Sequence, residues 1–283
     1  MNNDETCLNY KESGRCRTRH WMDSCSGMVK LTALAAILLS AAGCAQLPVE
    51  RSAPEPVAAK VGADQGIAPF SANPAGGLPR LWDPMVIFRN KKQTQYQLVA
   101  EQGKTVLHAF AEDATSGLMQ HVELEPSIQP WLRWDWKIGN PVSTRGTERQ
   151  VTEDSPARII LGFDGDKDTL PFSDQILFET AKVFTGHDFP YATLMYVWDK
   201  SAPVGTVMAS NRSGRIKMLV VANGADGVGQ WRGFTRNIVE DFELAYGEKP
   251  GKLIGVGVLT DTDNIGDKAE TWYGDIHLQH ARN

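Results

Sequence analysis

One stretch decides the fold class: Trp131-Leu132-Arg133-Trp134-Asp135-Trp136-Lys137-Ile138. Apolar and charged side chains alternate along it, which predicts a β-strand with one face in a core. Working outward, short runs rich in β-branched and aromatic residues, bounded by Gly, Pro, Asn or Asp, occur at residues 158–163, 192–198, 215–221, 253–259 and 272–278. Two further strands, 96–100 and 105–109, are expected to form a hairpin around residues 101–104.

Two segments have helical spacing instead. Residues 175–184 and 237–246 place apolar side chains on one helical face, and Gly186 and Gly247 follow as stop signals. They do not alternate with strands as a doubly wound α/β fold requires. The chain is therefore predicted to be mainly β, an antiparallel β-sandwich or jelly roll with two short covering helices.

The composition excludes some classes of protein. The chain has 283 residues, with 29 basic against 34 acidic side chains, so no excess of positive charge is present for nucleic acid. All 4 cysteines lie at or before Cys44, so the folded body is not a disulfide scaffold.

The N-terminal region reads as an export signal. Residues 28–43 hold one Lys and a short apolar run, too short to span a bilayer, as in a signal peptide. Small residues before Cys44 resemble the lipobox of bacterial lipoproteins, which implies lipidation of Cys44; ordinary cleavage near Ala42 is the alternative. Ala45 after the cysteine favours the periplasmic face of the outer membrane by the same resemblance. Residues 1–27 have no place in such a signal and are interpreted as an over-called start.

Residues 44–80 contain several prolines and little periodicity. They are predicted to be a flexible tether between the membrane surface and the domain. The β-sandwich domain is predicted to cover residues 81–283.

Several motifs follow one another in this domain: Pro156-Ala157-Arg158, Phe163-Asp164-Gly165-Asp166, residues 190–199, Pro203-Val204-Gly205-Thr206, residues 260–264 and residues 269–275. Together they resemble a family of bacterial exported proteins, domain of unknown function 3047, over residues 82–278. The resemblance implies a secreted β-sandwich of the Gram-negative envelope. It implies no particular activity.

Two acidic clusters are candidate cation sites. Asp164, Asp166 and Asp168 alternate and could bind Ca²⁺ through carboxylate oxygens, although the EF-hand pattern is absent; the alternative is a polar turn. A second cluster, Asp261, Asp263 and Asn264, ends an apolar strand. Such groups bind a cation or sugar hydroxyls, act as general acid and base, or simply form a turn.

The polar faces of the strands give a third candidate site. Arg133, Asp135 and Lys137 share one side of their strand, and Arg158 faces the same side as Ile160 on another. A last set, Tyr273, Asp275 and His277, shares one side of the final strand. If these faces coincide, they line a concave saccharide-binding surface with Trp131 and Tyr273 as stacking platforms. The alternative is a solvated face of weak ion pairs, with Trp134, Trp136 and Trp198 in the core.

Three functional hypotheses follow. The first is an envelope lipoprotein that binds a saccharide or similar polar ligand. The second is a carbohydrate-active hydrolase that uses a pair chosen from Asp261, Asp263 and Asp275, although no recognised catalytic motif is present. The third is a structural interaction protein stabilised by Ca²⁺.

Overall fold

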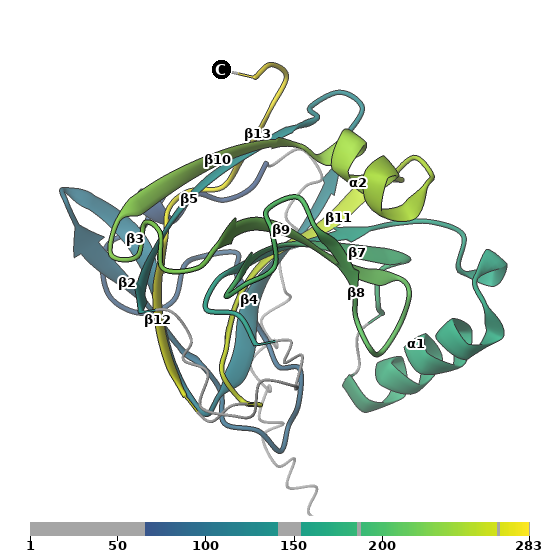
Figure 1. Ribbon diagram of the computed structural model, residues 1–283, viewed down its shortest axis with the longest axis horizontal. Coiled ribbons are helices and arrows are strands. Elements are labelled where there is room, and N and C mark those ends of the chain that lie inside the picture. Colours follow the sequence, from purple (N-terminus) through teal and green to yellow (C-terminus); the bar gives the residue numbers. More distant parts are fainter. Residues whose placement is uncertain (1–65, 141–153, 186–187, 265–266, 283) are drawn as a thin grey trace, which may run out of the picture. The chain divides into compact units, whose positions relative to one another are not determined.

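The computed structural model describes residues 66–140, 154–185, 188–264 and 267–282, which form two packed sheets (Figure 1). The seven-stranded sheet has the order β1 (Asp83–Met85), β4 (Thr115–Leu124), β11 (Leu253–Asp261), β6 (Arg158–Phe163), β7 (Ala192–Asp199), β9 (Ile216–Asn223), β8 (Val207–Ala209). The six-stranded sheet has the order β10 (Trp231–Asn237), β5 (Trp131–Asn140), β12 (Lys268–Tyr273), β3 (Lys104–Glu112), β2 (Gln95–Glu101), with β13 (His277–Gln279) beside β5.

The prediction of a mainly antiparallel β-sandwich with two short helices is confirmed. Among the described strands, β7 and β9 form the one parallel pair, and the other pairs are antiparallel. The strands β1, β4, β8 and β10 were not predicted.

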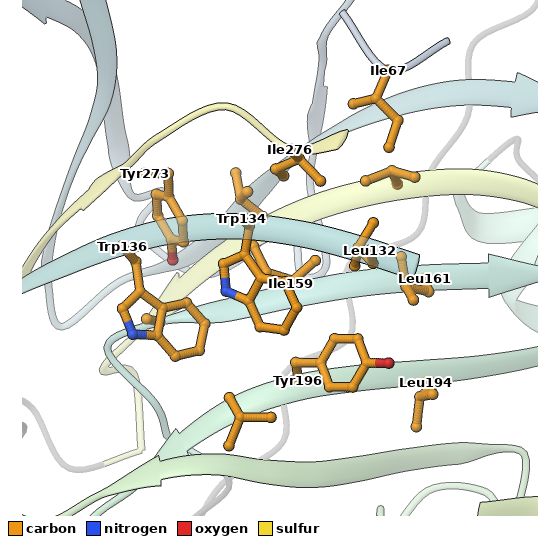
Figure 2. Close-up of a cluster of buried hydrophobic side chains, with 14 of the residues drawn as sticks. Ile67, Leu132, Trp134, Trp136, Ile159, Leu161, Leu194, Tyr196, Tyr273 and Ile276 are labelled. Atoms are coloured by element: carbon orange, nitrogen blue, oxygen red, sulfur yellow. The ribbon is translucent and has the colours of Figure 1, made fainter. Parts of the chain in front are cut away.

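The core lies between the sheets, where inward side chains of both interdigitate (Figure 2). As predicted, Trp134, Trp136 and Trp198 belong to it, with exposures of 0%, 1% and 3%. Trp134 stacks on Tyr196 of the facing sheet at 4.9 Å between ring centroids. These large aromatic side chains bury the most apolar area per residue, so they fix how the sheets pack.

The two helices differ in how they are attached. Helix α2 (Ile238–Tyr246) begins at Asn237, whose side-chain oxygen accepts the N–H groups of Val239 and Glu240, and its Phe242 packs on Phe163 at 4.7 Å. Helix α1 (Phe172–Thr185) follows the 3₁₀ turn η2 (Lys167–Thr169) and leaves the apolar side chain of Phe172 75% exposed.

The predicted boundary between tether and domain, near residue 80, is wrong for residues 66–80. This segment contains the 3₁₀ turn η1 (Phe70–Ala72), and Phe70 is fully buried against Trp82, with 4.8 Å between ring centroids. The backbone N–H of Ser71 also donates to the Asp275 carboxylate at 2.9 Å. The many prolines and glycines of this segment indicated a flexible linker, but the single buried side chain of Phe70 packs the segment against the sandwich.

The predicted signal peptide (28–43) and Cys44 lie outside the described residues. Within the part of the chain that the structure describes, no helix is both long and apolar enough to cross a membrane.

Candidate functional site

The outer face of the six-stranded sheet, meaning the face turned away from the other sheet, carries three tryptophans. Trp131 on β5, Trp231 on β10 and Trp272 on β12 are all partly exposed on this face. Trp231 lies opposite Lys137, which lies opposite Trp272, so these three residues form one row across three strands. Indole rings offer broad apolar surfaces for a ring-shaped ligand.

Asp135 occupies the next position of β5 on this face. Its neighbours on either side are Gly233, its register partner on β10, and Gly274, which directly follows β12 and whose N–H donates to the Asp135 carbonyl at 2.9 Å. Because neither neighbour has a side chain, the carboxylate lies in a gap. It makes no hydrogen bond or ion pair with the residues that the structure describes, so its oxygens are available to a ligand.

Lys137 connects the tryptophans to a charged group. Its ammonium lies 3.9 Å from the ring centroid of Trp272 and 5.8 Å from that of Trp231, and it forms an ion pair with Glu101 at the end of β2. Cation–π contacts of this kind are worth about 0.5–2 kcal/mol. Lys137 therefore covers part of Trp272 and leaves Trp231 the more accessible ring.

The indole ring of Trp272 is also held in place by residues other than Lys137. Its ring stacks near His108 at 4.9 Å between centroids, and His108 Nε2 lies 2.7 Å from the Glu270 carboxylate. On β5, Gly139 makes room for the indole: a Cβ there would lie 2.9 Å from Trp272 Cζ3. Trp272 thus has a fixed position on the sheet surface.

A second polar cluster lies on the outer face of the seven-stranded sheet, at the end of β11. Arg158 at the start of β6 donates through Nη1 to Asp261 Oδ2 at 3.1 Å, and both side chains are buried. Asp263 donates its backbone N–H to Asp261 Oδ1 at 3.3 Å and forms an ion pair with Lys91 at 3.2 Å. Asp154 accepts the backbone N–H of Asn264 at 3.1 Å.

The two central carboxyl groups of this cluster have different proton affinities. Burial raises the pKa of Asp261 to about 7, against the lowering effect of Arg158. Burial also acts to raise the pKa of Asp263, but the hydrogen bonds from Asp261 and Lys91 outweigh it and lower that pKa. Near neutral pH the pair therefore contains one carboxyl that exchanges its proton and one that stays ionised.

Among the residues that the structure describes, Asp154, Asp261 and Asp263 form the group of three that could hold a metal ion, with ligand atoms within 4.8 Å of one another. Arg158 and Lys91 already neutralise much of its charge. The geometry is thus that of a buried ion-pair network.

The model of a family described as "Protein of unknown function (DUF3047)" matches residues 80–277. The chain belongs to this family. A comparison with curated proteins found no match.

Three solved structures are similar to this DUF3047 chain at 10% sequence identity. A family 30 carbohydrate-binding module of a cellulosomal cellulase of Clostridium thermocellum gives a TM-score of 0.35 and covers 78% of this chain and 95% of its own. SGBP-B from a complex xyloglucan utilization locus in Bacteroides uniformis gives 0.31, with 76% and 50%. The cellulose induced protein Cip1 gives 0.34, with 71% and 92%.

The predicted site residues of this DUF3047 chain separate into two places. Trp131, Arg133 and Asp135 share the outer face of the six-stranded sheet. Asp261, Asp263, Asn264 and Arg158 meet on the other sheet, together with Asp154, which no sequence pattern indicated. The structure therefore does not bring these residues onto the single concave surface that the sequence predicted.

The prediction for Tyr273 is wrong. Its side chain is fully buried, and its hydroxyl donates to the Leu259 carbonyl at 2.9 Å, so it is not a stacking platform. The predicted strand 272–278 is interrupted at residues 274–276. Of the two aromatic residues at the end of β12, it is Trp272 that faces outward, away from the other sheet. The Asp275 carboxylate accepts hydrogen bonds from the backbone N–H and the hydroxyl of Ser71.

The predicted calcium ligands Asp164, Asp166 and Asp168 are not gathered into a site. All three are exposed, Asp164 Oδ1 accepts the N–H of Gly165, and Asp166 Oδ1 accepts the N–H of Asp168 as the cap of η2. The segment is the polar turn that the alternative interpretation described.

Proposed function

We propose that this DUF3047 chain is an exported lipoprotein whose β-sandwich binds a saccharide on the outer face of the six-stranded sheet. The observation that carries the proposal is Asp135: a partly exposed carboxylate without a partner among the described residues, between two glycines and next to Trp231 and Trp272. A surface carboxylate in an ordinary ion-pair network would instead be paired, as Asp263 is with Lys91.

The chemistry of a sugar ring suits this arrangement. A pyranose presents C–H groups on one face, which pack on an indole, and hydroxyl groups at its rim, which donate to a carboxylate. Trp231 provides the ring surface and Asp135 the acceptor, while the exposed guanidinium of Arg133 provides donors for ring and glycosidic oxygens.

Binding is tested by isothermal titration of the purified body, residues 66–283, with cellohexaose, maltohexaose and chitohexaose. We expect at least one probe to bind saturably, with Trp231→Ala and Asp135→Ala each weakening it at least tenfold. Arg80→Lys, an exposed substitution outside this face, is the matched control and is expected to bind like the parent. If all three sugars fail to bind, or if Asp135→Ala binds unchanged, the proposed site is wrong.

Export and anchoring rest on residues 28–44. Labelling of cells with a palmitate analogue is expected to modify the full chain and to be lost in Cys44→Ser. A full chain that stays unlabelled would restrict the proposal to saccharide binding.

A second candidate function, carbohydrate hydrolysis, is favoured by the separated pKa values of Asp261 and Asp263. A carboxyl with pKa about 7 beside one that stays ionised has the protonation states of a general acid and a base. Release of reducing ends from the same hexasaccharides, abolished in Asp261→Asn, is the expected result. Activity that survives both Asp261→Asn and Asp263→Asn would exclude this pair.

A further inference from the structure

The outer face of the seven-stranded sheet carries an apolar row that the functions proposed above do not use. Register partners on successive strands run Met119, Gly257, Ile160, Met195, Met218 and Met208. Every methionine among the described residues lies on this face, since Met85 is the register partner of Gly117, which is two residues from Met119 on β4 and therefore faces the same side. Thioether side chains are flexible and polarizable, and such surfaces adapt to apolar ligands of varied shape.

Burial along this row is uneven. Ile160 and Met218 are 4% and 7% exposed, whereas Met195 and Met208 are partly exposed on either side of Met218. Val197 and Val220 pack against the same residues from the neighbouring row. Met218 is therefore the floor of the row, with Met195 and Met208 at its sides.

Arg158 adjoins this row on the same face, because it lies two residues from Ile160 and opposite Val197 of β7. Only 4% of Arg158 is exposed, yet Nε and Nη2 are buried without any hydrogen-bond partner. Nη1 alone is satisfied, by Asp261. An unpaired buried donor costs about 1–3 kcal/mol and more when charged, so two on one guanidinium indicate a missing acceptor.

The geometry of the guanidinium specifies that acceptor. The Nε–H and one Nη2–H bond point the same way along one edge of the planar group. This edge pairs with two oxygens of one acid, as in a bidentate carboxylate contact. Since Asp261 occupies Nη1, the edge formed by Nε and Nη2 remains for a second carboxylate.

The charges of the side chains around Arg158 also allow an anion to bind there. Lys91 pairs with Asp263, and Arg212 helps to lower the pKa of Asp263 while its guanidinium stacks on Phe88 at 4.6 Å from the ring centroid. The cations Arg158, Lys91 and Arg212 thus face the carboxyl groups of Asp154, Asp261 and Asp263. When Asp261 is protonated, as it is below a pH of about 7, one more carboxylate balances the cluster.

We infer that the outer face of the seven-stranded sheet binds an amphiphilic carboxylate, with its head on the free edge of Arg158 and its apolar body along Met195, Met218 and Met208. From Ile160 to Met208 the row crosses three strand spacings, ~14 Å in total. This length suits a medium-length acyl chain. The site lies on the sheet opposite to the proposed saccharide site and does not depend on it.

Isothermal titration of the body, residues 66–283, with decanoate, decanol and acetate separates the contributions of head and chain. We expect saturable binding of decanoate with one site per chain, and at least tenfold weaker binding of decanol and of acetate. Arg158→Lys keeps the charge beside Asp261 but removes the parallel N–H groups, and we expect it to weaken decanoate at least tenfold. Arg80→Lys is the matched control on an exposed arginine.

Each result decides the inference. Absence of decanoate binding overturns it, and so does decanol binding as tightly as decanoate, which would leave no role for Arg158. Where Arg158→Lys fails to fold, Met195→Gln provides the second variant. It keeps the side-chain length and removes apolar surface, so unchanged decanoate affinity in this folded variant would overturn the placement of the chain.

Discussion

Gly233 and Asp135 lie opposite each other on β10 and β5, so close that a Cβ on residue 233 would lie 2.7 Å from Asp135 Oδ1. The space that a side chain would fill is the space in which the carboxylate lies. The position of the Asp135 carboxylate in the proposed saccharide site therefore depends on the glycine at position 233 of the neighbouring strand.

Gly233→Val tests that dependence. A β-branched residue suits a strand, so we expect the free energy of unfolding to change by no more than about 1 kcal/mol. The valine displaces the Asp135 carboxylate, and affinity for the sugar that binds the parent should fall at least fivefold in titration. Equal affinity in parent and variant would show that Asp135 does not contact the ligand.

Two tryptophans on different faces of the six-stranded sheet should respond in opposite ways to truncation. Trp134 is fully buried, so Trp134→Ala should lower the free energy of unfolding by about 3–5 kcal/mol. Trp231→Ala, on the outer face, should cost about 1 kcal/mol or less and act mainly on binding. Urea unfolding of both variants measures the difference; similar losses of stability would contradict the assignment of Trp231 to a ligand surface.

The pKa of Asp261 predicts an unusual pH dependence of stability. Its folded-state pKa is raised to about 7, above the unfolded value, so between about pH 4 and pH 7 the folded state binds more protons. Stability from this group is therefore complete below about pH 4 and is lost as pH rises to about 7, by on the order of 2–4 kcal/mol. Asp263, whose pKa is lowered, acts in the opposite sense and only at lower pH.

Urea unfolding of parent and Asp261→Asn across pH 4 to 8 measures this effect. Asparagine resembles the protonated acid, so the variant should lose the decline with pH, while Arg158, Lys91, Arg212, Asp154 and Asp263 remain in place around it. A parent whose stability instead increases steadily over this range would show that Asp261 is ionised throughout.

Chelation should leave the melting temperature unchanged within about 1 °C, because the carboxylates of Asp261 and Asp263 already have cationic partners. Differential scanning calorimetry with EDTA and then with excess Ca²⁺ checks this. A rise in melting temperature with Ca²⁺ that Asp263→Asn abolishes would identify a calcium site in the network.

The strands with clear alternation were predictable from the sequence, and β5 is the clearest case. Strand β4 was missed because its buried positions include the polar residues Thr115, Ser116 and Gln120. The side chains of Ser116 and Gln120 form hydrogen bonds with residues of other segments. The Gln120 side chain, for example, accepts the N–H of Ala68 at 2.8 Å. Burial of polar residues by such distant partners leaves no periodic signal.

The candidate sites show the same limit. Arg158 and Asp261 were each identified, but their contact joins residues 103 positions apart, and no local pattern indicates it. Tyr273 was assigned to the polar face together with Asp275 and His277, but β12 ends at Tyr273 and β13 begins only at His277, so the three residues do not share one strand. Trp231 was overlooked since Gly233 obscures the alternation of β10.

The position of β11 has a consequence for how the chain folds. This strand lies between β4 and β6, yet it belongs to the last part of the sequence, and its partners on β4 are more than a hundred residues earlier. Neither neighbour can complete its ladder until nearly all of the polypeptide has been made. Such non-local topology slows folding to about milliseconds to seconds. If the chain is exported unfolded, as proposed above, it cannot assemble this sheet early. Its unpaired strands then need protection from aggregation until β11 has been added.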